Sequence, residues 1–318
     1  MAGAMEAIVT GGVSDDALEA FLVRLREKGE TAQEIAAAAR VMRAHSLKLS
    51  KQFTHLLDTC GTGGDAKHTF NISTVAALVV CAAGVCVAKH GNRSVSGICG
   101  SADLLEALGL RIDLPPAEIE KSIETQGFGF FFAPRFHPAT RYALPARKRI
   151  QGKTLFNLLG PLSNPAGASF QLLGVYEERL VALMAGVLRE LGAARALVVH
   201  GSDGLDEVTL CGKTRVAELN AGTVKTYEIT PRDFGLPEAP TSTLVCGSKE
   251  ECRQAALQVL KGDRGPKSDV VCLNAGAAFF AAGRSKNIAD GVRLAQTTIA
   301  GGAALRKLNE IVEFSRGA

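Results

Sequence analysis

Hydrophobic residues recur at helical spacing near the start of the chain. In the stretch DALEAFLVRLREKG, apolar positions repeat at intervals of three and four, as they do along one face of an α-helix. Ser14 before two aspartates favours a helix N-terminus, and Gly29 is typical of a C-terminal stop. Thr31 and Glu34 match a capping box ahead of a second apolar run. The pattern predicts two helices over residues 14–47, forming a helical subdomain that precedes every glycine motif.

From about residue 53, short apolar runs alternate with longer, helix-like ones. VCVAKHG at 85–91 and RALVVHG at 195–201 have the length and composition of buried strands. STVAALVVCAAG and ERLVALMAGVLRELGA have the length and spacing of helices. This alternation predicts βα units and a mainly parallel sheet, in which functional side chains lie at the carboxyl ends of the strands.

Residues 207–229 show the two-residue alternation that is typical of strands. Apolar and polar residues alternate around Cys211-Gly212 and again around Ala221-Gly222. We expect antiparallel hairpins that turn at these dipeptides. Residues 248–315 return to helical spacing and predict further helices.

The composition limits the class of protein. The 318 residues are 47% hydrophobic and 21% charged, with a formal net charge of +4. This is ample for a core, whereas the small and scattered positive excess argues against a nucleic-acid partner. No run reaches the roughly 18 apolar residues of a membrane span. The N-terminus lacks the pattern of a signal peptide, so we expect no membrane partner and a cytoplasmic protein.

Cysteine and histidine usage does not indicate a zinc or histidine metal site. The eight cysteines include no CxxC pair, and the six histidines show no HxH or HExxH spacing. Buried and reduced thiols are the expectation for this spread.

The first candidate for chemistry is the glycine loop CGTGGD, residues 60–65. GTGGDA matches the dinucleotide pattern GxGxxG/A, but the next strand ends in KHG, without the acidic residue that a Rossmann site uses to bind ribose. No GK[ST] follows at P-loop spacing. Hydroxyl and amide side chains follow instead at 69–74, where the predicted helix starts. Helix capping accounts for one of them, but four in six residues indicate a ligand with several oxygen atoms.

The second candidate is KHGNRSVSGICGSADLLEALG, residues 89–109, which lies between a predicted strand and an amphipathic helix. A loop with two or more cations, an amide, hydroxyls and glycine hinges suits phosphate or pyrophosphate. A solvated polar loop is the simpler alternative.

The third candidate is GSDGLDE, which follows the strand RALVVH. Its pair Asp206-Glu207 could be a general acid and base, magnesium ligands or a solvated turn. Mg²⁺ takes one or two carboxylates together with substrate phosphates, so two phosphate-like loops elsewhere favour the metal. A general acid and base is less favoured because neighbouring side chains in a strand point to opposite faces. The basic segment from Arg135 to Lys153 is typical of a solvated face, although one inward arginine can bind a carboxylate bidentately.

Together these motifs resemble anthranilate phosphoribosyltransferases. GTGGD…TFNIST, KHGNRSVSG…GSADLLEALG, FFFAPRFHPA, RKRIQGKTLFNLLGPLSNPAG and HGSDGLDEV keep that family's order and spacing, from about residue 5 to the C-terminus. The resemblance implies transfer of the 5-phosphoribosyl group of phosphoribosyl pyrophosphate to the amine of anthranilate, with release of pyrophosphate, in tryptophan biosynthesis.

The resemblance also implies an α/β fold of the nucleoside phosphorylase and class IV phosphoribosyltransferase type. A small helical domain at 1–52, joined by a helical segment near 145–165, would precede a large domain with a mainly parallel sheet at 53–318. The family forms homodimers through the helical part, which makes a homodimer the expectation here.

Site residues are expected from the same resemblance, position by position. Those expected to bind the two substrates are Gly61, Gly64, Asp65, Thr69, Asn71, Ile72, Ser73, Thr74, Lys89, His90, Gly91, Asn92, Arg93, Ser94, Val95, Ser96, Gly97, Ser101 and Arg147. Among these, Asn92, Arg147 and Gly61 match positions that contact anthranilate. Ser73, Asp206 and Glu207 are expected to bind two Mg²⁺ ions.

No strong general base is expected, because an aryl amine is already a free base at neutral pH. We therefore expect catalysis by positioning and by stabilisation of the leaving group. Asp65 is expected to order its loop or to reach a ligand hydroxyl. Ile98-Cys99 departs from the Lys-Ser or similar pair that is common in the family.

Two alternatives stay open. One is an enzyme like pyrimidine nucleoside phosphorylase, which would use free phosphate, and the other is a non-catalytic paralogue that binds nucleic acid. The acidic pair and the NIST cluster favour a magnesium and pyrophosphate substrate over the first. The absence of a basic face argues against the second.

Overall fold

A seven-stranded mixed sheet organises the chain in the computed structural model, which describes residues 1–94 and 97–318. The strands are β1 Leu57–Gly61, β2 Val87–Gly91, β3 Phe128–Phe132, β4 Phe170–Gly174, β5 Arg195–Gly201, β6 Thr214–Asn220 and β7 Thr223–Ile229. Their spatial order is β3-β2-β1-β4-β5-β6-β7. The first five in this order are parallel, and β6 and β7 extend the edge as an antiparallel pair. The predicted α/β fold with a mainly parallel sheet is confirmed.

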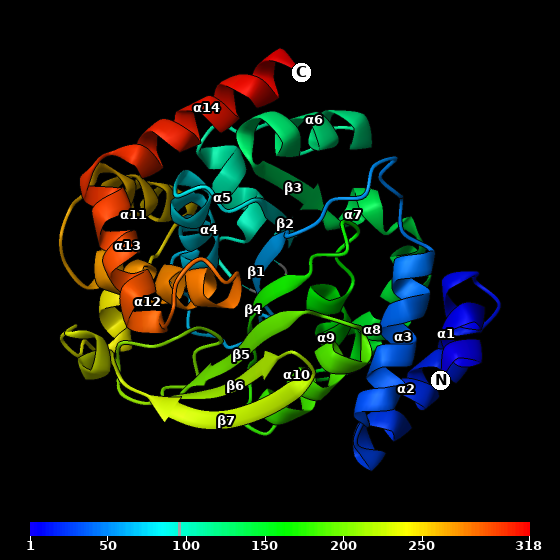
Figure 1. Cartoon of the computed structure of the whole chain (residues 1–318). Coiled ribbons are helices and arrows are strands. Elements are labelled where there is room, and N and C mark those ends of the chain that lie inside the picture. Colours follow the sequence, from blue (N-terminus) through cyan, green and yellow to red (C-terminus); the bar gives the residue numbers. More distant parts are fainter. Residues whose placement is uncertain (95–96) are drawn as a thin grey trace.

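Helices cover both faces of this sheet (Figure 1). They are α1 Ala2–Val9, α2 Asp15–Lys28, α3 Ala32–Ala44, α4 Ile72–Ala82, α5 Ser101–Ala107, α6 Pro116–Gln126, α7 Ala133–Phe136, α8 Leu144–Arg149, α9 Leu155–Leu162, α10 Leu180–Glu190, α11 Lys249–Lys261, α12 Pro266–Ala281, α13 Ile288–Ala300 and α14 Ala303–Gly317. Short 3₁₀ helices are η1 Pro138–Ala143, η2 Pro231–Phe234 and η3 Thr241–Leu244. None of the helices in the described ranges combines the length and apolarity needed to cross a bilayer.

Alternation along the strands divides the core into two layers. Leu172 and Leu197 point to one face and pack with α4 and the helices α11–α14. The next residues, Leu173 and Val198, point to the other face and pack with α9, α10 and the N-terminal helices. Successive strand side chains face opposite ways, so one apolar run supplies both layers.

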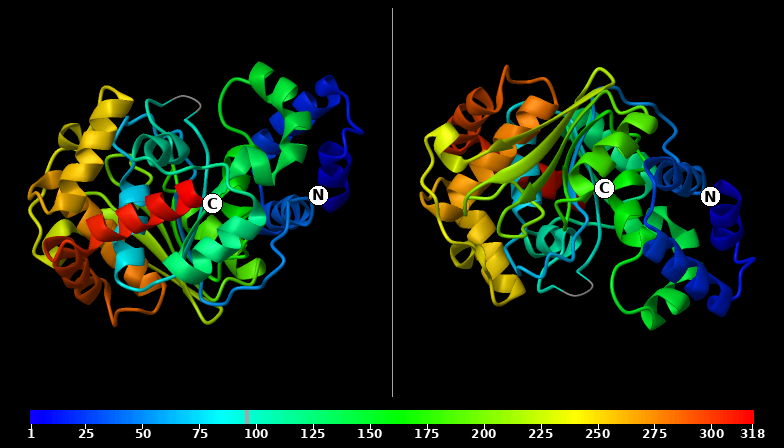
Figure 2. Two further views of the ribbon diagram at one scale, coloured as in Figure 1. Left: turned by 90° about the horizontal axis from the view of Figure 1, so that it is seen from above. Right: turned by 90° about the horizontal axis from the view of Figure 1, so that it is seen from below.

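The N-terminal helices share a core with segments far away in sequence. Apolar side chains of α1–α3 pack in one cluster with those of α8, α9 and α10. Figure 2 shows these blue helices beside the green ones, on the side of the molecule away from the orange and red helices. The helical layer is therefore discontinuous in sequence, and it brings residues 144–162 against the sheet.

Local signals located the first two predicted helices correctly. Ser14 accepts a hydrogen bond from the Ala17 amide at the start of α2, and Gly29 ends this helix at a φ of 83°. Thr31 and Glu34 form both hydrogen bonds of the capping box of α3. These contacts lie within a few residues of each other, so the sequence alone specifies them.

The hairpin prediction for residues 207–229 was right for one turn and wrong for the other. The turn at Ala221-Gly222 joins β6 to β7, as expected. Residues 207–213 form no strand, because β6 pairs antiparallel with β5 instead. Thr209 in this segment donates to the Asp203 carboxylate and accepts from the Cys211 amide. The alternating pattern there reflects a buried irregular loop.

Two buried histidines face each other between β2 and the helical layer. The rings of His90 and His137 meet edge to face at 5.0 Å between centroids. Burial lowers the pKa of His90 to about 3 and that of His137 to about 4. Both rings are therefore neutral in the folded protein at pH 7.

Acid should destabilise the fold through these histidines. A folded pKa below the unfolded value means that stability is complete above about pH 6.5 and is lost as the pH falls towards 4. For His137 this loss is roughly 2 kcal/mol at pH 4.5. The variant His137→Gln should lose correspondingly less between pH 7 and pH 4.5 in urea unfolding. His45→Gln, at a half-exposed position, is the control, and an unchanged pH slope in His137→Gln would contradict the assignment.

Candidate active site

The three candidate loops meet at the carboxyl ends of neighbouring parallel strands. Gly61 ends β1 and pairs in register with Gly174, which ends β4. β2 lies on the other side of β1 and ends at Gly91. The helix that follows β1 packs on one face of the sheet, and the helix that follows β4 packs on the opposite face. Open α/β sheets bind ligands at such a switch point.

The first glycine loop adopts a conformation that few other residues tolerate. Gly63 and Gly64 have φ values of 66° and 75°. Ala66 and His68 also have positive φ, at 57° and 55°, which is uncommon for residues with side chains and clusters at functional sites. The Asp65 carboxylate accepts a hydrogen bond from the Lys67 amide at 3.2 Å. Asp65 therefore orders its own loop, one of the two roles expected for it.

The acidic pair converges on this loop and on the start of α4. Asp206 accepts from the Gly63 amide at 2.8 Å, and Glu207 accepts from the Ser73 amide at 3.0 Å. The expectation that the two side chains diverge was wrong. It assumed a strand, whereas both residues lie in the irregular segment after β5.

The electrostatics of the pair suit a divalent cation. Burial raises the pKa of Asp206 to about 7, and the nearby charge of Asp65 adds to this. Burial also raises the pKa of Glu207 to about 8, with the charge of Asp206 as the next cause. Both side chains keep partial access to solvent, so a cation can reach them.

Two carboxylates and the Ser73 hydroxyl are hard oxygen ligands of the kind that Mg²⁺ takes. In residues 1–94 and 97–318 no group of three or more His, Cys, Asp or Glu side chains is placed to hold a metal. Mg²⁺ takes few protein ligands and completes its shell with water and substrate phosphates.

The start of α4 is tied to the second loop. Asn71 does not cap the helix with its side chain; its amide donates to the Cys99 carbonyl at 2.9 Å and its oxygen accepts from Thr74 at 2.6 Å. The capping alternative is therefore wrong for Asn71. Thr69 pairs with Val245, and the Ile72 side chain is buried in the core, so Ile72 can offer a ligand only its backbone.

Lys89 lies beneath the site and not on the loop surface. Its side chain is buried, and its ammonium donates to the Thr59 carbonyl at 2.5 Å and to the Ser73 hydroxyl at 3.4 Å. Burial lowers the pKa of Lys89, against the attraction of Asp58. From this position Lys89 can act on a ligand only through Ser73 and through its charge.

The second loop is closed by its own contacts. The Ser101 hydroxyl donates to the Asn92 carbonyl at 3.3 Å, and a Cβ at Gly91 would overlap Ser101. The amides of Ser94 and Gly100 both donate to the Asp103 carboxylate at 2.9 Å. Gly97 donates to the Ser94 hydroxyl at 2.7 Å. Val95 and Ser96 lie outside the described residues.

Arg93 is not a free cation in this structure. Its guanidinium forms two hydrogen bonds to Glu106, at 2.6 and 3.0 Å, and one to Asp103 at 3.4 Å. The sequence placed Arg93 in a loop suited to phosphate, without its helical partners. A ligand would have to compete with the acidic residues of α5 for this side chain.

His90 and Arg147 belong to the side of the site that faces the helical layer. His90 contacts the Gly160 carbonyl of α9 through Nδ1 at 3.0 Å. Arg147 on α8 stacks on the Phe156 ring at 5.1 Å, and burial lowers its pKa. Within the described part of the chain, no hydrogen bond or ion pair engages the Arg147 guanidinium. It is an available arginine.

Two features of the site escaped sequence reasoning. Lys153 stacks its ammonium on the Tyr176 ring at 3.3 Å and lies against Gly64, where a Cβ would be 3.2 Å from Cε. The basic segment held the signal, but solvation was the simpler interpretation. Asn164 donates to the buried Asp58 at 2.8 Å and to the Ala88 carbonyl at 2.7 Å, joining the helical layer to β1 and β2. No spacing of residues in the sequence predicts the contact of Asn164 with Asp58.

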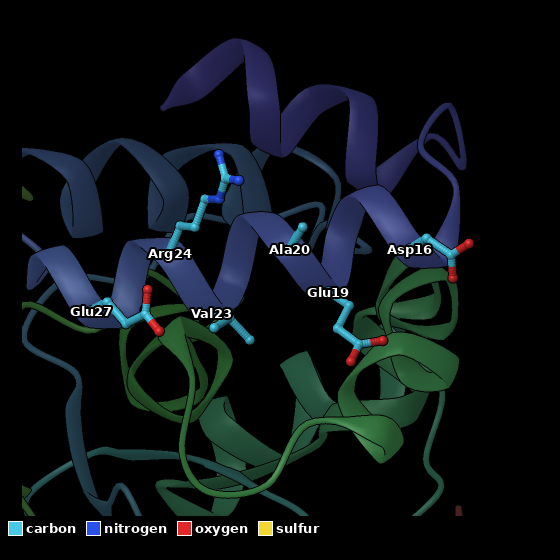
Figure 3. Close-up of a pocket in the computed structure, with 6 residues that line it drawn as sticks. All are labelled: Asp16, Glu19, Ala20, Val23, Arg24 and Glu27. Atoms are coloured by element: carbon cyan, nitrogen blue, oxygen red, sulfur yellow. The ribbon is translucent and has the colours of Figure 1, made fainter.

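A separate hollow of about 420 Å³ runs along α2 (Figure 3). Its lining side chains are Asp16, Glu19, Ala20, Val23, Arg24 and Glu27, all from this one helix. It contains none of the strand-end residues.

Comparisons with known proteins agree with the motifs. Residues 53–305 match the model of the glycosyl transferase family, a/b domain, and residues 1–46 match its helical bundle domain. The anthranilate phosphoribosyltransferase of Nitrosomonas europaea is 51% identical over 98% of this chain and 92% of its own length. That of Moorella thermoacetica is 50% identical over 98% of this chain and 92% of its own.

Solved structures are similar to this chain as well. The crystal structure of anthranilate phosphoribosyltransferase from Thermus thermophilus has a TM-score of 0.95 and 47% identity, covering 99% of this chain and 94% of that one. The Saccharomyces cerevisiae enzyme in complex with phosphoribosyl pyrophosphate and Mg has a TM-score of 0.88 and 29% identity, covering 96% and 86%. A structure of the same yeast enzyme holds 4-fluoroanthranilate.

Introducing a side chain at Gly174, the last residue of β4, should displace the segment that carries Asp206. A Cβ at Gly174 would overlap the Asp206 backbone, so Gly174→Ala must displace the acidic segment. We expect a loss of roughly 1–3 kcal/mol in unfolding free energy, as for other overpacking changes. Gly186→Ala in α10, where the nearest atom would be 3.7 Å away, is the control. Equal stability of the two variants by thermal unfolding would contradict this packing.

Proposed function

The chain belongs to the anthranilate phosphoribosyltransferase family, and from that premise we propose that it transfers the 5-phosphoribosyl group of phosphoribosyl pyrophosphate to the amine of anthranilate. The products are N-(5-phosphoribosyl)anthranilate and pyrophosphate, in tryptophan biosynthesis. The observation that carries the proposal is the convergence of Asp206 and Glu207 on the Gly63 and Ser73 amides, where β1 and β4 end.

The polyanionic substrate lies between the first two loops in this proposal. Gly61, Gly64, Asp65 and the residues 69–74 form one wall, and the loop 89–97 with Ser101 forms the other. Ser73, Asp206 and Glu207 hold two Mg²⁺ ions. Bound Mg²⁺ supplies positive charge to the departing pyrophosphate. Lys89 adds a fixed charge from below, and Lys153 adds one from the helical layer.

The acceptor lies against the helical layer. Arg147 orients the carboxylate of anthranilate, since a guanidinium binds a carboxylate with two parallel hydrogen bonds. The Asn92 amide completes the contact at the end of β2. His90 does not take the proton of the amine, because a pKa of about 3 makes it a very weak base. The chain accelerates transfer by holding amine and ribose in line and by stabilising the leaving group.

The helical part plays a structural role in the proposal. We assign residues 1–52 and the segment near 145–165 to one domain and the rest of 53–318 to the other, because α1–α3 share a hydrophobic cluster with α8 and α9. A homodimer through this part follows from the family resemblance. A phosphorylase activity is less supported, since free phosphate does not need a paired carboxylate site for a metal.

Anthranilate consumption should depend on magnesium and on the acidic pair. With phosphoribosyl pyrophosphate present, the purified chain should remove anthranilate fluorescence only when Mg²⁺ is added. Glu207→Gln keeps an acceptor for the Ser73 amide but removes a ligand charge, so we expect activity to fall about 10- to 100-fold and the Mg²⁺ requirement to rise.

The matched control for that assay is Glu228→Gln on β7, an exposed carboxylate at the far edge of the sheet. It should behave like the parent protein. Turnover without Mg²⁺, or with free phosphate and a nucleoside in place of these substrates, would refute the proposed reaction.

The Arg147 assignment makes a separate prediction. Arg147→Ala should raise the KM for anthranilate about 10-fold or more, the size of a lost charged hydrogen bond, and change the KM for phosphoribosyl pyrophosphate far less. Arg149→Ala is the control, because the neighbouring Arg149 pairs with Asp16 and Glu19 of α2. Equal increases in both KM values would exclude this role.

A further inference from the structure

Helix α2 holds the turn between α8 and α9. The Arg26 guanidinium, in the last turn of α2, donates from Nη1 to the Gln151 carbonyl at 2.7 Å and to the Lys153 carbonyl at 3.4 Å. Gly152 lies between these two acceptors at a φ of 90°, and a Cβ there would be 3.2 Å from the same nitrogen. At the start of the turn, Arg149 pairs with two carboxylates of α2. One helix therefore fixes this turn at its start and at its middle.

The same turn places Lys153 against the first glycine loop. Its ammonium lies 3.3 Å from the centre of the Tyr176 ring, and a Cβ at Gly64 would be 3.2 Å from its Cε and 3.5 Å from its Nζ. Tyr176 belongs to the same wall, because its amide donates to the Thr62 hydroxyl at 3.1 Å. The Thr62 amide in turn donates to the Gly174 carbonyl at 3.0 Å. Lys153 thus crosses from the helical layer to the loop proposed to contact the polyanion.

The Lys153 ammonium is available to an anion. Within the part of the chain that the structure describes, no oxygen atom accepts a hydrogen bond from it, and its contact with Tyr176 is a cation–π contact. The side chain is half-buried, and burial lowers its pKa against the attraction of Glu177, Asp206 and Asp65. A partly desolvated ammonium with unused N–H donors gains strongly from a negatively charged group.

We propose that Lys153 binds a phosphate group of phosphoribosyl pyrophosphate and that Arg26 is the residue that positions it. The ligand rests on the proposed function, whereas the hold of Arg26 on the turn does not. Gly64 has no side chain, so the ammonium can move from the Tyr176 ring to a phosphate on the glycine loop by rotation of side-chain bonds. Without Arg26, a turn that contains a glycine is freer to change conformation, and the ammonium is held less closely at this wall.

Calorimetry with phosphoribosyl pyrophosphate and Mg²⁺, without anthranilate, measures the proposed contact directly. Lys153→Met removes the charge and keeps an unbranched side chain, so the Kd should rise about 10-fold, the size of a lost charged hydrogen bond. Lys153→Arg keeps a cation and should retain most of the affinity. Arg26→Ala should raise the Kd severalfold. The KM for anthranilate should change little in all three variants.

The two residues should not act independently. If Arg26 works through Lys153, Arg26→Ala should cost no further affinity in a Lys153→Met background. Arg24→Ala, at an exposed position of the same helix, is the matched control and should bind as the parent protein does. A double variant whose loss of affinity is the product of the two single losses would overturn the positioning role.

Trypsin tests the turn without any ligand. Residues 148, 149 and 153 are lysine, arginine and lysine, so cleavage sites lie in the turn and beside it. Arg26→Ala should be cut there severalfold faster than the parent protein, with the fragments identified by mass, and Arg24→Ala should be cut at the parent rate. Equal rates in Arg26→Ala and the parent protein would show that Arg26 does not hold the turn.

Unchanged affinity in Lys153→Met would overturn the phosphate contact. A parent protein that binds phosphoribosyl pyrophosphate but does not consume anthranilate would refute only the proposed reaction, and the binding comparisons would still decide the inference. A parent protein that does not bind phosphoribosyl pyrophosphate would refute both the proposed function and the Lys153 contact.

Discussion

The candidate site depends on one close approach at the ends of two neighbouring strands. The segment that carries the acidic pair passes so near to β1 and β4 that a Cβ at Gly61 would overlap the Asp206 side chain, and one at Gly174 would overlap its backbone. Because both positions are glycines without a side chain, Asp206 can reach the Gly63 amide and Glu207 can reach the Ser73 amide. The two carboxylates are therefore held by backbone donors, which do not depend on side-chain conformation.

This arrangement places charge where folding disfavours it. Two carboxyls have pKa values near or above neutrality, a lysine is buried beneath them, and two histidines towards the helical layer are kept neutral. Buried groups of this kind destabilise the isolated protein and are retained where a ligand completes them. Ala66 and His68 in the adjoining loop have positive φ, and backbone strain of this kind also persists mainly at functional sites. The apolar layers on the two faces of the sheet offset that cost.

The site draws on both layers of the molecule. In the proposed reaction the sheet supplies the loops for the polyanion, while the helical layer supplies Arg147, Lys153 and the Gly160 carbonyl that contacts His90. Asn164 ties the two together through Asp58. Behind the second loop, the Asn71 amide donates to the Cys99 carbonyl and so ties the start of α4 to that loop. One sheet edge thus joins the loops proposed for the polyanion and the side chains proposed for the acceptor.

Much of this protein was determined by local sequence. The caps of α2 and α3, the βα alternation, the Ala221-Gly222 turn and the glycine loops all rest on contacts between residues close in the chain, and they were predicted correctly. Tertiary structure decided the rest. In the folded chain Arg93 pairs with Glu106, and Lys89 is buried beneath the site. Residues 207–213 form no strand, and Asp206 and Glu207 contact the amides of Gly63 and Ser73. These outcomes depend on which strands become neighbours, and a sequence pattern carries the period of each element but not its partners.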